Sequence, residues 1–119
     1  MEKLIFIVDD NDANLTMAAS SLENDYRILT MPSAEKMFLL LEKKRADLIL
    51  LDVEMPEMTG LEAIVKLKEN PQWKDIPCLF LTGRDDESLL AEAKKAGALE
   101  VVKKPIVPSA LLDCVKRYV

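Results

Sequence analysis

The segment Leu4-Ile5-Phe6-Ile7-Val8-Asp9-Asp10 sets the pattern of this chain, because five consecutive apolar residues lead directly into two carboxylates. Polar residues also follow three later apolar segments: Leu48-Ile49-Leu50-Leu51 before Asp52, Leu79-Phe80-Leu81 before Thr82-Gly83, and Leu99-Glu100-Val101-Val102 before Lys103-Lys104-Pro105. The first three apolar runs do not alternate with polar residues, which is typical of strands buried on both faces of a parallel sheet. The carboxyl ends of parallel strands meet at one edge, so we expect these polar groups to lie close together.

Between these segments, the spacing of apolar residues predicts helices, so that strand and helix patterns alternate five times. The predicted strands cover residues 4–8, 26–31, 47–51, 78–81 and 99–102. The predicted helices cover residues 12–23, a segment capped by Ser33, residues 59–69, residues 87–96 up to Gly97, and a last helix opened by Pro108. Five such units with right-handed crossovers predict an α/β fold, a doubly wound five-stranded parallel sheet with helices on both faces. With 119 residues, the chain is expected to form one domain over residues 1–119.

Composition restricts the classes of function. The formal net charge is −5 and no block of five basic residues occurs, which argues against direct nucleic acid binding. No apolar run approaches the roughly 20 residues of a membrane span, and Glu2 and Lys3 precede the first strand closely enough to leave no room for a signal peptide. These features predict a cytoplasmic protein without membrane contact. The sequence is compatible with a single-domain protein or with the amino-terminal module of a longer one.

The residue types that carry reactive groups narrow the chemistry further. The chain has no histidine, which excludes histidine-based zinc sites, Ser-His-Asp triads and a phosphohistidine on this chain. Its two cysteines, Cys78 and Cys114, fall in a strand and in a helix pattern, where we expect buried small apolar side chains and no disulfide.

The strand ends gather three carboxylates, a hydroxyl and an ammonium. Mg²⁺ binds through a few carboxylates together with water and phosphoryl oxygens, and a lysine offers a compact cation to an oxyanion. Taken one by one, these residues have simpler explanations, since Asp pairs and Asp12 can cap a helix and a lone Asp after a strand is commonly a turn residue. Their joint placement at the expected sheet edge favours a site for a metal ion and a phosphoryl group.

Five motifs, one at each strand end or connection, carry a resemblance to a known family. They are Val8-Asp9-Asp10-Asn11, Leu51-Asp52-Val53-Glu54-Met55-Pro56 with Gly60 beyond, Leu81-Thr82-Gly83, Gly97-Ala98, and Val102-Lys103-Lys104-Pro105. In this order over the whole chain, they resemble the receiver domain of response regulators in bacterial two-component signalling. The resemblance implies a flavodoxin-like strand order 2-1-3-4-5. It also implies a regulatory domain rather than an enzyme, phosphorylated by a histidine kinase or phosphotransfer protein.

The resemblance also implies roles for individual residues. Asp52 occupies the phosphoacceptor position, and carboxylates are competent nucleophiles in covalent catalysis. Asp10 and Asp52 are expected to ligate Mg²⁺ directly, Asp9 to act mostly through water, and Glu54 to contribute its backbone carbonyl. Thr82 and Lys104 are expected to contact the phosphoryl oxygens, with the Lys104–Pro105 peptide in the cis form. The side chains of Glu54 and Arg84 either influence how fast the phosphoryl group is lost or are simply solvated loop charges.

The chain departs from the usual family pattern near its carboxyl end. The family commonly has Tyr or Phe three residues before the active-site lysine, whereas this chain has Val101, and position 106 is Ile where Phe is frequent. In the family, that aromatic ring turns inward when the Thr hydroxyl moves to the phosphoryl group. Val101 is too small to make the same movement. The surface that contacts an output domain or effector protein is expected on the fourth helix, the fifth strand and the fifth helix.

Three other classes of protein share parts of this pattern. A haloacid-dehalogenase-type phosphatase places its nucleophile on the first strand and its acidic pair last, the reverse of the order here. A flavodoxin-like FMN carrier needs a hydroxyl- and glycine-rich phosphate loop after the first strand, where Asp9 and Asp10 would repel phosphate. A phosphorylation-independent pseudo-receiver, acting only as a protein-binding module, remains the main alternative, although such domains usually lack a key residue that is present here.

Overall fold

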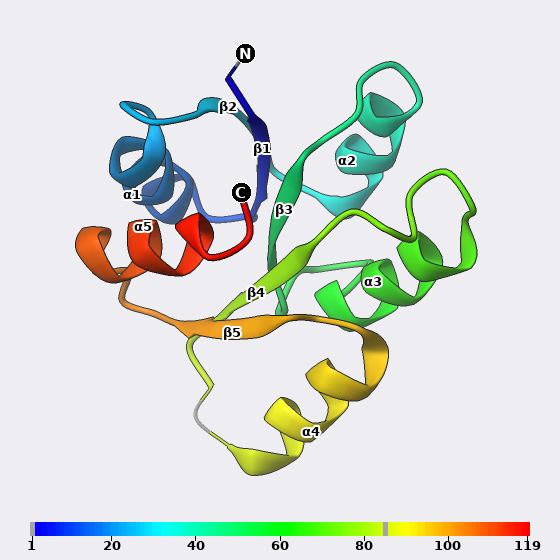
Figure 1. Ribbon diagram of the computed structural model, residues 1–119. Coiled ribbons are helices and arrows are strands. Elements are labelled where there is room, and N and C mark those ends of the chain that lie inside the picture. The colour runs from blue at the N-terminus through cyan, green and yellow to red at the C-terminus, as the bar shows by residue number, and fades with distance from the viewer. Residues whose placement is uncertain (1, 85) are drawn as a thin grey trace.

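The computed structural model describes residues 2–84 and 86–119, and it contains five strands that alternate with five helices (Figure 1). The strands are β1 (Leu4–Val8), β2 (Arg27–Met31), β3 (Leu48–Asp52), β4 (Cys78–Thr82) and β5 (Glu100–Lys103). The helices are α1 (Asp12–Leu22), α2 (Ala34–Leu41), α3 (Gly60–Glu69), α4 (Glu87–Ala96) and α5 (Pro108–Lys116). Every predicted element is therefore present, with most boundaries within one residue of the prediction.

All five strands are parallel, in the order β2-β1-β3-β4-β5, which confirms the predicted doubly wound α/β fold. Each position of β1, β3 and β4 is buried, as their uninterrupted apolar sequences predict. Strand β2 lies at an edge of the sheet and is only partly buried, which explains its weaker sequence pattern.

The helices cover both faces of the sheet. Helices α1 and α5 lie on one face, and α2, α3 and α4 lie on the other (Figure 1). Two apolar cores result, one on each face, and successive residues of the central strands contribute to them in turn: Ile5 and Ile7 face α1 and α5, whereas Phe6 and Val8 face α2 and α3. Because successive side chains of a strand point to opposite faces of the sheet, a continuous apolar strand contributes to both cores.

The helix ends are fixed by specific caps. Asn11, not Asp12, caps α1, because the Asn11 side chain accepts a hydrogen bond from the backbone N–H of Asn14. Ser33 caps α2 as predicted, and Thr59 forms a capping box with Glu62 at the start of α3. Gly97 ends α4 at φ +110, a left-handed conformation that glycine adopts without steric cost.

Some details of the prediction were wrong. The apolar pattern of residues 87–96 predicts that Leu89, Leu90 and Ala93 face inward, but Leu90 is 38% exposed and only the other two of these three are buried. Strands β3 and β5 each begin and end one residue later than predicted. Asp52 is therefore the last residue of β3 and not the first residue after it. The basic residues at positions 43–45 would suit the carboxyl end of a longer helix, but α2 ends at Leu41 and these residues lie beyond it.

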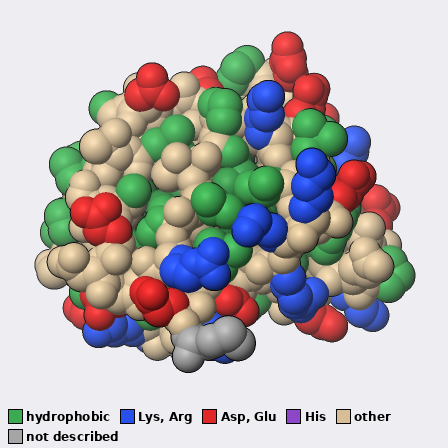
Figure 2. Space-filling view, turned by 90° about the horizontal axis from the view of Figure 1, so that it is seen from above, with side chains coloured by type: hydrophobic (Ala, Val, Ile, Leu, Met, Phe, Trp, Pro, Cys, Tyr) green, Lys and Arg blue, Asp and Glu red, His purple; other side chains and the backbone are tan. Residues whose placement is uncertain are grey.

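Both cysteines are buried and free, and they belong to the two different cores on opposite faces of the sheet. Among the described residues, no helix has the length and apolar character needed to cross a membrane. Acidic, basic and apolar side chains are intermingled on the face shown in Figure 2.

Candidate functional site

The carboxyl edge of the sheet brings the predicted site residues together. Asp9 follows β1 directly, Asp52 and Thr82 are the last residues of β3 and β4, and Lys104 follows β5. Asp9, Asp52 and Thr82 are also the buried polar residues of the described chain, with exposed fractions of 0%, 1% and 0%. Polar groups that are buried at a sheet edge rather than solvated are the expected feature of a site in an open α/β fold.

Three carboxylates form a compact acidic cluster. Asp9, Asp10 and Asp52 each present an oxygen within 4.8 Å of the others, with Asp10 exposed and the other two buried. One Asp9 oxygen, Oδ1, accepts a hydrogen bond of 2.9 Å from the backbone N–H of Asn11. The other, Oδ2, is buried and lies 2.9 Å from the Lys104 ammonium. A compact set of three hard oxygen ligands fits Mg²⁺.

Lys104 is the cation of the site. Its Nζ lies 2.9 Å from Asp9 Oδ2, as an ion pair, and donates a 3.0 Å hydrogen bond to Asp52 Oδ1. Burial lowers the pKa of Lys104, but the two carboxylates outweigh that effect and hold the pKa above its usual value. The backbone N–H of Lys104 donates to the Thr82 carbonyl at 2.8 Å, and the Lys104–Pro105 peptide is cis, as predicted.

Asp52 is held in an environment that favours its protonated form. Desolvation by burial raises the pKa of Asp52 to about 6; the negative charge of Asp9 adds to this effect and Lys104 opposes it. The carboxylate is therefore poorly solvated and close to a neutralising cation, and its basicity is increased. These properties suit a nucleophile whose attack requires little loss of water.

Thr82 does not bond to Asp52 in this structure. Its hydroxyl donates a 3.0 Å hydrogen bond to Glu54 Oε1 and accepts one of 3.0 Å from the backbone N–H of Arg84. Arg84 Nε lies 3.9 Å from Glu54 Oε2, and the two side chains are 47% and 46% exposed, so they are linked to each other and also solvated. Sequence patterns do not reveal the hydrogen bond between Thr82 and Glu54, because contacts between separate loops have no local signal.

Glu54 lies outside the acidic cluster formed by the described residues. Its side chain contacts Thr82 instead, and the contribution of its backbone carbonyl to a metal ion stays a prediction.

Gly60 allows helix α3 to approach the site closely. Its N–H donates to the Val53 carbonyl at 2.8 Å, and a Cβ added at Gly60 would lie only 2.3 Å from the carbonyl oxygen of Asp52. The sequence motif placed Gly60 near Asp52, but the steric reason becomes evident only in the fold.

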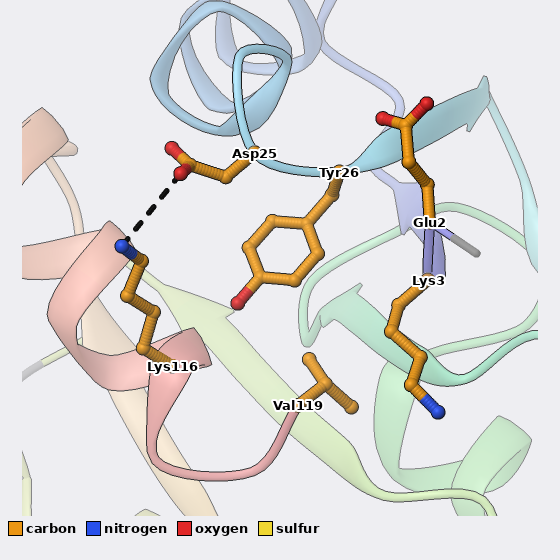
Figure 3. Close-up of a pocket in the computed structure, with 6 residues that line it drawn as sticks. All are labelled: Glu2, Lys3, Asp25, Tyr26, Lys116 and Val119. Atoms are coloured by element: carbon orange, nitrogen blue, oxygen red, sulfur yellow. Dashed lines mark ion pairs between the residues drawn. The ribbon is translucent and has the colours of Figure 1, made fainter.

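A wide hollow lies away from this site. It has a volume of about 640 Å³ and opens at the amino edge of the sheet, lined by Glu2, Lys3, Asp25, Tyr26, Lys116 and Val119 (Figure 3). The hollow is wide and open, and its one drawn ion pair, Lys116 with Asp25 at 3.6 Å, is partly exposed. Size therefore does not mark the reactive site here, whereas the buried charges at the opposite edge do.

Comparisons with known proteins agree with this geometry. Residues 5–116 match the family described as the response regulator receiver domain. The chain belongs to this family. It is therefore a receiver domain of two-component signalling, as the strand-end motifs indicated.

Individual relatives support the assignment. The structure of the chemotaxis protein CheY4 of Vibrio cholerae matches over 100% of both chains, with a TM-score of 0.94 and 29% identity. A BeF3-activated receiver domain of DrrB matches over 99% of this chain and 97% of that one, with a TM-score of 0.88 and 29% identity. A probable cyclic di-GMP phosphodiesterase of Vibrio cholerae is 40% identical over 86% of this chain, but the chain spans only 23% of that protein's length.

Proposed function

We propose that this receiver domain is a phosphorylation-activated switch. In this proposal, Asp52 accepts a phosphoryl group from a phosphohistidine on a histidine kinase or phosphotransfer protein, and the domain then changes conformation. The observation that carries the proposal is the placement of Asp52: it is buried, its Oδ1 lies 3.0 Å from the Lys104 ammonium, and two further carboxylates are clustered around it.

The transfer can be written from the residues present. A carboxylate oxygen of Asp52 forms a bond to phosphorus, while the bond between phosphorus and the donor imidazole nitrogen breaks and its electron pair leaves with the imidazole. Lys104 pairs with the Asp52 carboxylate before transfer, and after transfer its ammonium can donate to a phosphoryl oxygen, which carries the added negative charge. The Thr82 hydroxyl can donate to another phosphoryl oxygen once it leaves Glu54.

Asp10 and Asp52 are the direct ligands that we propose for Mg²⁺, with Asp9 acting mostly through water and Glu54 through its backbone carbonyl. When bound, the ion neutralises charge that would otherwise repel an anionic phosphoryl donor. The cluster of three carboxylates beside a single ammonium supports this proposal, because a divalent cation would offset the negative charge that Lys104 leaves uncompensated.

The output of the switch is proposed to pass through the surface of α4, β5 and α5 to an output domain or effector protein. We further propose that the domain is regulatory rather than an enzyme with its own substrate and that it works in the cytoplasm. The alternative is a pseudo-receiver that binds partners without phosphorylation. The complete set of Asp9, Asp10, Asp52, Thr82 and Lys104 at one sheet edge favours the phosphorylated switch.

Transfer from a phosphohistidine donor tests this proposal. A phosphorylated histidine phosphotransfer domain, labelled with ³²P, should transfer its label to the protein in Mg²⁺ but not in EDTA, and the bond formed should be hydrolysed in acid or base as acyl phosphates are. Asp52→Asn should not be labelled. Asp113→Asn, which changes an exposed carboxylate on α5, is the matched control and should be labelled normally. Absence of transfer from any of several donors and from small phosphodonors would favour the pseudo-receiver.

A further inference from the structure

The Thr82 hydroxyl is already engaged in the unphosphorylated protein. It has one proton to donate, and that proton goes to Glu54 Oε1 at 3.0 Å. Its oxygen accepts from the backbone N–H of Arg84. Thr82 is fully buried, so water does not offer the hydroxyl another partner. A phosphoryl oxygen on Asp52 can therefore receive a hydrogen bond from Thr82 only if Glu54 gives it up.

Glu54 is in turn linked to the start of α4. Arg84 Nε lies 3.9 Å from Glu54 Oε2. The same guanidinium holds Asp86 more tightly, through Nε at 3.0 Å and Nη2 at 3.0 Å from Asp86 Oδ2. Asp86 is the N-cap of α4, and its Oδ1 accepts from the backbone N–H of Leu89 at 2.7 Å. A continuous polar path thus joins the hydroxyl beside the phosphoacceptor to the first turn of a helix.

We propose that Glu54 is a positioning residue that competes with the phosphoryl group for the Thr82 proton, and that its release is passed through Arg84 and Asp86 to the first turn of α4. The inference rests on the proposed phosphorylation of Asp52. When Thr82 turns to a phosphoryl oxygen, the Glu54 carboxylate loses its donor, and Arg84 is the cation beside it. Closer pairing of Arg84 with Glu54 draws the guanidinium away from the Asp86 cap.

The path through Glu54, Arg84 and Asp86 can couple Thr82 to α4, whereas the side chain at position 101 cannot. Val101 is partly buried and packs against the core on the α4 face, and its side chain has no polar atom or ring that could follow Thr82. The network of Glu54, Arg84 and Asp86 begins at the Thr82 hydroxyl and reaches the first turn of α4.

The effect of Glu54 on phosphoryl binding depends on which of the two states its bond to Thr82 stabilises. An interaction that exists in only one of two states favours that state, so the bond between Glu54 and Thr82 opposes phosphoryl binding. Removing the carboxylate with Glu54→Ala should raise the apparent affinity for beryllofluoride in Mg²⁺ by about three- to tenfold. The removed negative charge alone would also raise this affinity, so the single variant does not separate the two causes.

A double-mutant cycle separates them. Thr82→Val keeps the shape of the side chain and removes the hydroxyl. In that background, Glu54→Ala should change beryllofluoride affinity by less than about twofold, because no proton remains to compete for. Glu57→Ala, which removes an exposed carboxylate from the same loop, controls for charge and should have little effect in either background. An equal gain from Glu54→Ala with and without the Thr82 hydroxyl would overturn the competition.

A measurement on the free protein tests the link to α4 independently of phosphorylation. Without Mg²⁺ or beryllofluoride, Glu54→Ala should lower the hydrogen-exchange rate of the Leu89 amide by about threefold, because Arg84 then pairs with Asp86 alone, and Glu57→Ala should not. An unchanged rate would overturn the link to α4. Failure of the unaltered protein to bind beryllofluoride would refute the proposed function and the competition, whereas normal binding with purely additive variants would refute the competition alone.

Discussion

The ammonium of Lys104 donates a 3.0 Å hydrogen bond to Oδ1 of Asp52, across the edge of the sheet between the ends of β3 and β5. The two residues are separated by 52 positions in the chain, and the order of the parallel strands brings them together. The pairing neutralises only part of the acidic cluster, because one cation faces three carboxylates. The free protein therefore holds an excess of negative charge at this edge, and the first two predictions follow from it.

Asp52→Asn should stabilise the metal-free protein near neutral pH. Desolvation by burial raises the pKa of Asp52 to about 6, above the value of about 3.9 for an unfolded chain. A raised folded-state pKa contributes stability that is fully present below about pH 4 and is lost as the pH rises through about 6. The variant should therefore melt a few degrees higher than the unaltered protein at pH 7.5 in EDTA, with the difference shrinking at pH 4.

Magnesium should stabilise the unaltered protein by mass action. At a Mg²⁺ concentration a hundredfold above its dissociation constant, the free energy of unfolding should increase by about 2.7 kcal/mol. Asp10→Asn should raise the melting temperature without metal, because it removes one of three clustered carboxylates, and should reduce the response to Mg²⁺. A melting curve that does not change across millimolar Mg²⁺ would count against a metal site.

Gly60→Ala should be strongly destabilising. The added methyl group would lie 2.3 Å from the Asp52 carbonyl oxygen and 2.9 Å from the Val53 Cα, both backbone atoms that have little freedom to move. We expect a loss of about 2–4 kcal/mol in urea denaturation. Gly83→Ala is the control, since a Cβ there meets no atom within 4 Å, and it should change stability by less than about 1 kcal/mol.

Val101→Tyr tests whether position 101 accepts the larger side chain common in relatives. Val101 is only partly buried, beside the core that includes Leu89 and Ala93 of α4, so a tyrosine can extend towards solvent. We expect a change in the free energy of unfolding of less than about 1 kcal/mol. Ala93→Tyr, at a fully buried position of the same core, should be much more damaging. An equal loss of unfolding free energy in the two variants would show that position 101 cannot accept a larger side chain.

The fold and the main site could be predicted from sequence because their signals are local. Apolar segments followed by polar residues predicted that Asp9, Asp52, Thr82 and Lys104 lie at a common edge, and the structure has them there. The network around Glu54 could not be predicted in this way, since its hydrogen bond to Thr82 joins residues 28 positions apart on separate loops. The same limit applies to the α1 cap, where Asn11 and Asp12 are both suitable residues and only the backbone geometry selects Asn11.

The most direct test of the central claim is to locate the phosphoryl group on the protein. After incubation with acetyl phosphate and Mg²⁺, reduction with borohydride converts an aspartyl phosphate to homoserine, which peptide mass spectrometry can assign to a position. We predict conversion at Asp52 alone, dependent on Mg²⁺ and lost in Asp52→Asn. Conversion at another carboxylate, or undiminished acid-labile phosphorylation of Asp52→Asn, would contradict the assignment of Asp52 as the phosphoacceptor.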